Sequence, residues 1–191
     1  MWFRRPTSAA VNRYLRAMSS QPLSYPHVGA TNSSGCPSGY VLDCNRSCLG
    51  TGGEVFDRAC AAVRSWRMFD LPWLLLAWPD APIEPGAIVA PVVYFSGVWW
   101  PNACQIVYVM DDDQPHRRFG FAYGTLVGHL ERGEERFLVE MLPDGSVWFE
   151  TRAFSQAAKL LSRIAYPLVR RGQLRFFADA HAAMLREVTK T

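Results

Sequence analysis

The chain has 191 residues, of which 49% are hydrophobic and 19% are charged, and its formal net charge is +3. A chain of this length and composition builds one domain with a sizeable core and a short extension at most. The small net charge excludes a protein that binds nucleic acid through its overall charge, so we expect no nucleic-acid partner.

The cysteine pattern and the apolar runs indicate the cellular compartment in which the protein lies. Five cysteines form an odd count without a CxxC pair, which argues against a secreted disulfide framework and against a zinc finger. We expect most of them to be buried thiols. The most apolar run, Leu71 to Trp78, is too short to span a bilayer, and the N-terminus lacks the apolar core of a secretory signal. We therefore expect a cytoplasmic protein without a membrane span, a metal or a cofactor.

The N-terminal part of the chain predicts an arm outside the main domain. Residues 6–18 are predicted to form an amphipathic helix, because their apolar residues repeat at helical spacing. Residues 21–39 are rich in proline and glycine, which predicts a loop. We expect residues 1–39 to form this helix and loop arm, and residues 40–191 to form a single α+β domain.

The next part predicts four strands and one helix. Pro91 and Gly97 weaken the longest of these strands, which indicates a sheet edge or a bulge. The expected elements are strands at 40–49, 73–78, 87–99 and 103–110 and a helix at 54–69.

The stretch from Arg118 to Phe154 predicts three antiparallel strands around which the rest is organised. Side chains alternate between the two faces of a strand. One face of the first strand would carry only glycine, at Gly120, Gly124 and Gly128, and the other would carry Phe119, Phe121, Tyr123 and Val127. A bare strip lets another element approach closely, so we expect the C-terminal helix to lie over these glycines.

The C-terminal part of the sequence is predicted to contain a hairpin loop and two helices. Residues 129–135 are expected to form a hairpin loop around Gly133, and Ser155 is expected to cap a helix at 156–164. A long helix at 168–188 follows, in which Gly172 would mark close contact with the bare strip. Adjacent strands with helices set aside predict an α+β fold: a curved antiparallel sheet packed on a long C-terminal helix, with an N-terminal helical extension.

Five segments resemble a known family. They are SYPHVGAT at 24–31, WRMFDLPW at 66–73, WPDAPIEPG at 78–86, GFAYGTLVGH with GEERFLVE at 120–140, and AFS at 153–155. Together they resemble the DUF1990 family of uncharacterised bacterial and plant proteins, over Arg5 to about Met184. Gln156 stands where the family pattern implies proline. The resemblance implies no activity. The order of elements is also similar to the helix-grip superfamily of lipid and small-ligand binders, an analogy of fold only.

The first hypothesis for function is a module that binds a small hydrophobic or lipid-like ligand. Seven Trp, seven Tyr and eleven Phe exceed what packing alone demands, which indicates an aromatic pocket between the sheet and the C-terminal helix. The candidate ligand-binding residues are Trp66, Trp73, Tyr94, Trp99, Tyr108, Phe121, Tyr123 and Trp148.

The second hypothesis is an enzyme. A histidine beside carboxylates can serve as a general base oriented by an acid, and His129 with Glu135 is the weak candidate pair. The alternative is that these groups form the rim of a hairpin, in which Glu135 and Arg136 pair across strands and His129 caps the turn.

The third hypothesis is an interaction protein that docks on an anionic partner through basic helices. Arg4, Arg5, Arg13 and Arg16 have no acidic neighbour before residue 20, and basic residues also dominate the C-terminal helix. Basic helix faces are more often ordinary solvated surface, so both interpretations stay open.

Overall fold

The computed structural model describes residues 1–77, 81–158 and 166–190. Its helices are α1 (Ser8–Met18), α2 (Gly53–Arg64) and α4 (Tyr166–Thr189), with two short 3-10 turns, η1 (Ala30–Asn32) and η2 (Arg67–Phe69). Its strands are β1 (Val41–Thr51), β2 (Leu74–Ala77), β3 (Ile88–Phe95), β4 (Val98–Pro101), β5 (Cys104–Asp112), β6 (Arg118–Thr125), β7 (Glu131–Met141) and β8 (Ser146–Ala157).

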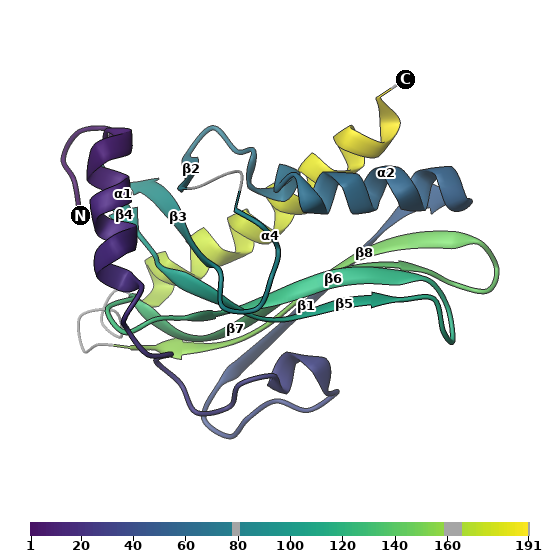
Figure 1. The fold of residues 1–191 in the computed structure, drawn as a ribbon, viewed down its shortest axis with the longest axis horizontal. Helices are drawn as coiled ribbons and strands as arrows, with labels where there is room; N and C mark the ends of the chain where they lie inside the picture. Colours follow the sequence, from purple (N-terminus) through teal and green to yellow (C-terminus); the bar gives the residue numbers. More distant parts are fainter. Residues whose placement is uncertain (78–80, 159–165, 191) are drawn as a thin grey trace.

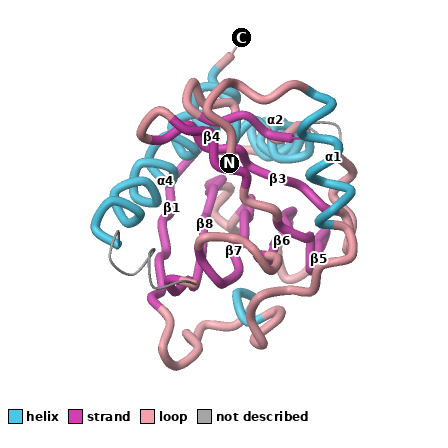
Figure 2. Tube along the Cα trace, turned by 90° about the vertical axis from the view of Figure 1, so that its left-hand side faces the viewer, coloured by secondary structure: helices cyan, strands magenta, loops and turns pink. Residues whose placement is uncertain are grey.

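The strands form one curved antiparallel sheet with helices on one side. The strand order is β1-β8-β7-β6-β5-β3-β2, and β4 pairs with β3. Helices α2 and α4 lie against the face that we call the inner face, while the loop carrying η1 lies against the opposite, outer face (Figures 1 and 2). The predicted α+β class, with a curved antiparallel sheet on a long C-terminal helix and a short N-terminal helix, is confirmed.

The main hydrophobic core fills the space between the inner face and the helices. Trp66, Phe69 and Phe137 belong to it, and Phe176 of α4 packs against it with its ring 5.4 Å from that of Phe69. A second, smaller cluster joins α1 to β2 and β3 through Val11, Leu15, Ala77, Ala90 and Val92. The N-terminal helix therefore has its own apolar contact with the sheet.

The strand expected at 87–99 is two strands joined by a tight turn. Ser96 and Gly97 have φ values of 51° and 79°. Two successive residues with positive φ form the turn that best fits a two-residue hairpin. Gly97 therefore reverses the chain, where the sequence had suggested only an edge or a bulge.

The helix expected at 156–164 does not begin at Gln156. Strand β8 continues to Ala157, which pairs with Glu131 of β7. Ser155 is consequently a strand residue and caps no helix. Residues 159–164 lie outside the described part of the chain.

The hairpin loop expected at 129–135 is also wrong, because β7 already begins at Glu131. Gly133 lies within the strand, and a Cβ at this position would stand 1.9 Å from the carbonyl oxygen of Phe154. Only glycine allows β7 and β8 to approach this closely. As a result, Glu134 and Glu135 are consecutive strand residues on opposite faces of the sheet.

The glycine strip lies on the outer face, so the expected contact with the C-terminal helix is wrong. Phe121 and Tyr123 point into the core beneath the helices, since burying aromatic surface stabilises far more than covering bare backbone. Gly124 is covered by the ring of Tyr25 from the arm, and an added Cβ would lie 2.2 Å from its hydroxyl. Around Gly172 of α4, an added Cβ would meet no atom of the described residues within 4 Å.

The cysteines are less buried than expected. Cys60 and Cys104 are buried, whereas Cys36, Cys44 and Cys48 are exposed, and all five are free thiols. Cys44 and Cys48 alternate with inner-face residues along β1 and therefore point outward.

We predict opposite effects of alanine at Gly124 and at Gly172. Gly124→Ala should lower the free energy of unfolding by about 1–3 kcal/mol, because the new methyl group overlaps the buried Tyr25 ring. Gly172→Ala should raise it by up to about 1 kcal/mol, because the site is open and alanine favours helix. Urea unfolding monitored by tryptophan fluorescence measures both. Equal stability of Gly124→Ala and the parent would show that the arm is not seated on this glycine.

Candidate functional site

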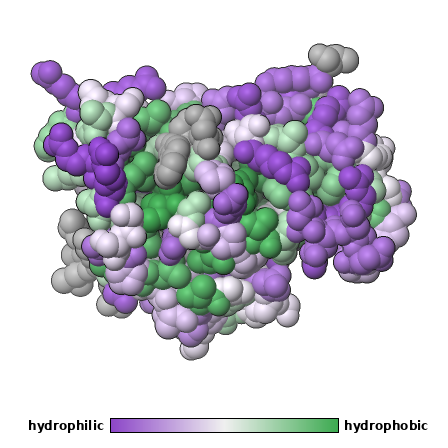
Figure 3. Space-filling model, in the orientation of Figure 1, coloured by the Kyte–Doolittle hydropathy of each residue, from purple (hydrophilic) through white to green (hydrophobic). Residues whose placement is uncertain are grey.

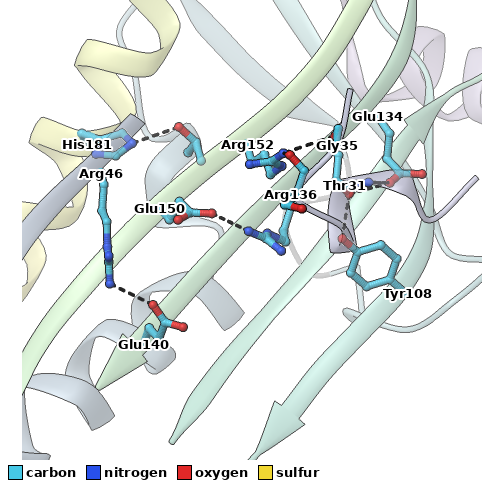
Figure 4. Close-up of polar contacts among 12 residues, drawn as sticks. Thr31, Gly35, Arg46, Tyr108, Glu134, Arg136, Glu140, Glu150, Arg152 and His181 are labelled. Carbon is cyan, nitrogen blue, oxygen red and sulfur yellow. Dashed lines mark hydrogen bonds and ion pairs between the residues drawn. The ribbon is translucent and has the colours of Figure 1, made fainter. Parts of the chain in front are cut away.

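A buried carboxylate, that of Glu134, holds the N-terminal arm on the outer face. Glu134 is 2% exposed. It accepts hydrogen bonds from the Tyr25 hydroxyl and the backbone N–H of Gly29, both at 2.7 Å. It also accepts the backbone N–H of Thr31 at 2.9 Å and the Thr31 hydroxyl (Figure 4). Both carboxylate oxygens are therefore engaged by the arm.

The backbone of the arm is shaped for this contact. Gly29 has a φ of 83° and begins the short turn η1, which turns its N–H and that of Thr31 toward the same carboxylate. Backbone N–H groups that converge in such a turn form an anion-binding concavity. Burial and the neighbouring Glu134 carboxylate raise the pKa of Tyr25, so its hydroxyl remains a donor. Glu134 thus anchors the arm and is not free to bind a ligand.

Ion pairs occupy the remaining outer face. Arg136 pairs with Glu150, and the Arg152 guanidinium donates to the carbonyl oxygens of Ser34 at 2.6 Å and Gly35 at 3.2 Å (Figure 4). The predicted cross-strand pair of Glu135 and Arg136 is therefore wrong, because the two side chains lie on opposite faces. These contacts extend the attachment of the arm along the sheet.

The eight predicted ligand-binding residues do not form one pocket. Four lie on the inner side, in or against the main core: Trp66, Trp73, Phe121 and Tyr123. Two lie on the outer face, where the Tyr108 hydroxyl bonds that of Thr31 and Trp148 lies under Arg46. The last two, Tyr94 and Trp99, lie on the β3–β4 hairpin with their rings 5.0 Å apart.

The inner face carries a partly buried acid, Glu135. Its Oε2 accepts a hydrogen bond from the Tyr123 hydroxyl at 2.7 Å, while its buried Oε1 has no hydrogen-bond partner among the described residues. Burial raises the pKa of Glu135 to about 8, although the Tyr123 hydrogen bond opposes this rise. A buried carboxyl group in this state holds a proton at neutral pH and can donate it.

A second acid, Glu131, lies on the same face beneath the first half of α4. Its Oε1 accepts a hydrogen bond from the Gln173 side chain at 2.6 Å, and Gln173 also donates to the Ser155 hydroxyl at 3.0 Å. Burial raises the pKa of Glu131 to about 7, against the lowering effect of Arg170. Arg170 in turn pairs with Asp43 of β1. This end of the inner face is thus polar, whereas the other end is apolar core.

The acid–base pair of His129 and Glu135 lacks the expected contact. The Nδ1 atom of His129 accepts the backbone N–H of Glu131 at 2.9 Å, which is the turn cap that the alternative interpretation predicted. Burial lowers the pKa of His129 to about 4. Within the described residues no hydrogen bond joins His129 to Glu135. Glu135 with Tyr123 is therefore the stronger proton-transfer candidate, and catalysis itself stays a hypothesis.

An open groove of about 760 Å³ lies between the end of α2 and the edge of the sheet. We call it the α2 groove. Figure 3 shows hydrophobic surface near the centre of this view, bordered by hydrophilic side chains on the α2 side. Its lining residues are Arg64, Ser65, Arg67, Ala81, Pro82, Ile83, Val109, Asp111 and Phe119. None of the eight predicted ligand-binding residues is among them.

The α2 groove combines an apolar floor with a basic rim. The Arg64 guanidinium lies 3.8 Å over the Phe119 ring and pairs with Asp111 at 3.1 Å. The charge of Arg67 is less neutralised than that of Arg64, because the carboxylate that pairs with its guanidinium, that of Glu187, is 4.0 Å away. A smaller hollow of about 140 Å³ adjoins the groove and shares Arg64, Asp111 and Phe119. Sequence reasoning missed this site because residues from four separate segments build it.

The described residues also bear on metal sites and membrane spans. No group of three or more His, Cys, Asp or Glu residues in the described ranges is arranged to hold a metal ion. No helix of the described chain is both long and apolar enough to cross a membrane.

The chain is similar to proteins that have no assigned function. A family model described as "Domain of unknown function (DUF1990)" matches residues 24–183. A "UPF0548 protein" of Dictyostelium discoideum is 32% identical over 204 residues, covering 97% of this chain and 94% of that protein. A protein of the same name from Deinococcus radiodurans is 37% identical over 181 residues, covering 90% of each chain.

Solved structures share the fold at low sequence identity. A hypothetical protein from Helicobacter pylori matches with a TM-score of 0.52 at 11% identity, covering 84% of this chain and 95% of that chain. A protein from Mycobacterium smegmatis matches with a TM-score of 0.51 at 13% identity, covering 78% of this chain and 91% of that chain. These likenesses support the helix-grip arrangement of the sheet and α4.

We predict that Glu134→Gln lowers the free energy of unfolding by about 2–3 kcal/mol. The amide replaces one accepting oxygen with a donor group, so at least one of the four arm donors loses its acceptor. Urea unfolding gives the loss, and limited proteolysis reports release of the arm. Glu54→Gln, at an exposed position of α2, is the matched control and should change stability by only a few tenths of a kcal/mol.

We also predict that Glu135 makes the folded state less stable as pH rises. Its pKa is about 8 when folded, against an ordinary value of 4.5, so the folded state keeps a proton that the unfolded state loses between these values. The free energy of unfolding therefore falls through this window, by up to about 1.4 kcal/mol per pH unit.

Glu135→Gln removes the cost of deprotonating this carboxyl group in the folded state. The free energy of unfolding of the variant minus that of the parent should therefore increase from about pH 5 to about pH 8. His129 and His181, whose pKa values burial lowers to about 4, destabilise both proteins alike as pH falls below the ordinary histidine value. Glu131, whose pKa is raised to about 7, destabilises both proteins in the same window. The difference between the two unfolding curves therefore reports Glu135 together with its coupling to Glu131. A difference that does not change with pH would show that this carboxyl group is not protonated in the folded protein.

Proposed function

Because the chain belongs to the DUF1990 family, whose description names no activity, we propose its function from its geometry. The protein binds a small amphipathic molecule, with an apolar body and one anionic group, in the α2 groove. The observation that carries this proposal is a cavity of about 760 Å³ with an apolar floor and two arginines at its rim.

The size of the groove suits such a ligand, and its lining offers polar and apolar surface, of which the polar part is the larger. Pockets for small molecules typically measure about 300–1,000 Å³ and place a few polar groups around a mainly apolar wall. Ile83, Val109 and Phe119 supply apolar surface, and each methylene group that a ligand buries there contributes about 0.8 kcal/mol. This supports the hydrophobic, lipid-like class of ligand that the aromatic content indicated.

The charge of the rim selects the polar end of the ligand. A guanidinium group matches a carboxylate or phosphate with two parallel hydrogen bonds. Arg67 is about half exposed, and its contact with Glu187 is long at 4.0 Å, so it can turn to a ligand at little cost. Arg64 is already paired with Asp111 and contributes less net positive charge.

The proposed site differs in place from the pocket first expected between the sheet and the C-terminal helix. Phe69, Phe137 and Phe176 pack against one another in that space, with ring centres 5.4–6.4 Å apart. Trp66 lies directly behind the groove, where its indole N–H donates to the carbonyl oxygen of Ala81 at 3.1 Å. The aromatic core therefore supports the wall of the groove from within.

We predict that the protein binds a fluorescent fatty acid in the groove. Two variants should weaken this binding in different ways. Arg67→Gln should weaken binding of the carboxylate probe about ten-fold, but leave its alcohol analogue unchanged, because only the anion uses the guanidinium. Ile83→Trp should weaken both probes, because the larger side chain fills the apolar floor. Titration monitored by fluorescence measures each dissociation constant.

Matched controls lie on the exposed side of α4, at Arg171 and Leu174. Arg171→Gln and Leu174→Trp should leave both dissociation constants unchanged. Native mass spectrometry of the purified protein provides an independent test, since a copurified amphipathic molecule should be lost from Ile83→Trp. Probe binding that Ile83→Trp does not affect would overturn the proposed site.

A further inference from the structure

The β3–β4 hairpin presents aromatic side chains to solvent. Residues 85–110, which contain the hairpin, include no charged residue. Tyr94 is 47% exposed and Phe95 is 45% exposed, and they lie on opposite faces of the strand next to the Ser96–Gly97 turn. Both faces of the hairpin tip are therefore apolar and open.

The N-terminal segment adds to this apolar surface. Trp2 donates its backbone N–H to the carbonyl oxygen of Trp99 at 2.9 Å and accepts the N–H of Trp99 at 2.8 Å. This pairing fixes the segment along the free edge of β4. Met1 and Phe3, on either side of Trp2, are 67% and 77% exposed. Four of the most exposed large apolar side chains thus gather at one end of the molecule.

Four arginines flank the same end. Arg4 and Arg5 are exposed and follow Phe3 directly, so they lie within two or three residue lengths of β4. Arg13 and Arg16 are exposed on α1, three residues apart and hence on one face of the helix. At the left-hand end of Figure 3, over α1 and the N-terminal segment, hydrophobic and hydrophilic side chains lie side by side.

Helix α1 packs against β2 and β3 and lies beside β4 and the N-terminal segment, at the same end of the molecule as the hairpin (Figure 1). The Tyr14 hydroxyl donates to the carbonyl oxygen of Pro101 at 3.4 Å, and the Tyr14 ring lies 5.9 Å from that of Trp2. Residues 1–42 contain no acidic residue. We call this surface, made of Met1, Phe3, Tyr94, Phe95, Arg4, Arg5, Arg13 and Arg16, the aromatic–basic surface.

We propose that the aromatic–basic surface docks the protein on the surface of an anionic lipid bilayer. Aromatic side chains partition to the boundary between lipid headgroups and acyl chains. Arginines beside them interact with acidic headgroups, at about 1 kcal/mol or a five-fold change in affinity for each one near the membrane. The hairpin tip enters the interface while α1 and the N-terminal segment remain at headgroup level.

The layout of the charges favours a membrane over a nucleic acid. Proteins that bind single strands interleave aromatic platforms with a basic groove that follows the backbone. Here the hairpin carries no charge and the arginines lie on separate neighbouring segments. None of the four arginines is among the described residues that stack on an aromatic ring, which are Arg46, Arg64, Arg117 and Arg175.

Vesicle flotation of the full chain tests the proposal. The protein should float with vesicles of phosphatidylcholine and phosphatidylserine, bind vesicles of phosphatidylcholine alone much more weakly, and dissociate as salt is raised. Arg4→Gln combined with Arg5→Gln should weaken binding to the anionic vesicles about 25-fold. Tyr94→Ser combined with Phe95→Ser should weaken it about ten-fold, since both side chains lose apolar burial.

Two control variants separate this surface from general charge and hydrophobicity. Arg171→Gln with Arg186→Gln, and Leu174→Ser with Leu185→Ser, change exposed positions of α4 and should leave vesicle binding unchanged. Circular dichroism confirms that each variant is folded. Absence of flotation, or equal losses in the α4 controls, would overturn the proposal. Tighter binding to single-stranded RNA than to anionic vesicles would also overturn it and identify a nucleic-acid surface.

Discussion

The structure depends on one buried carboxylate, that of Glu134, and on the four hydrogen bonds that the N-terminal arm donates to it. An ionised carboxyl group taken out of water is costly unless donors surround it, so β7 and the arm stabilise each other only together. Gly124 leaves the space in which the Tyr25 ring lies. The segments SYPHVGAT and GEERF, distant in sequence, are thereby parts of one contact.

Strand geometry gives Glu134 and Glu135 opposite environments. Because β7 runs without a turn through Gly133, consecutive side chains point to opposite faces. Glu134 meets four donors on the outer face. On the inner face, in the part of the chain that the structure describes, Glu135 has one donor, Tyr123, and one oxygen without a partner. The first carboxyl group stabilises the fold, and the second is held protonated at a cost. Such a cost is typical of groups kept for binding or proton transfer.

The sequence predicted the α+β class because period-two alternation and helical spacing are local signals. It separated Phe121 and Tyr123 from the glycines Gly120 and Gly124, but alternation does not say which face the helices cover. The helices cover the face whose aromatic side chains gain most from burial, and this is decided only when the helices and the sheet pack together. The partner of Glu134 and the lining of the α2 groove were likewise unpredictable, because each brings together segments that local patterns treat separately. The turn at Ser96–Gly97 could have been recognised, since a short polar and glycine pair between apolar runs signals a hairpin.

The α2 groove and the aromatic–basic surface rest on different hydrophobic clusters. Phe119 and Ala81 of the groove belong to the main core, whereas Val11 and Leu15 join α1 to the second cluster. Strands β2 and β3 contribute residues to both clusters and thereby connect the two sites. A single amphipathic ligand class links the two proposals chemically, because molecules with an apolar body and an anionic group concentrate at membrane surfaces. A protein docked there by its hairpin would meet such ligands at high local concentration. Membrane binding would then raise the rate of ligand capture without altering the intrinsic affinity of the groove.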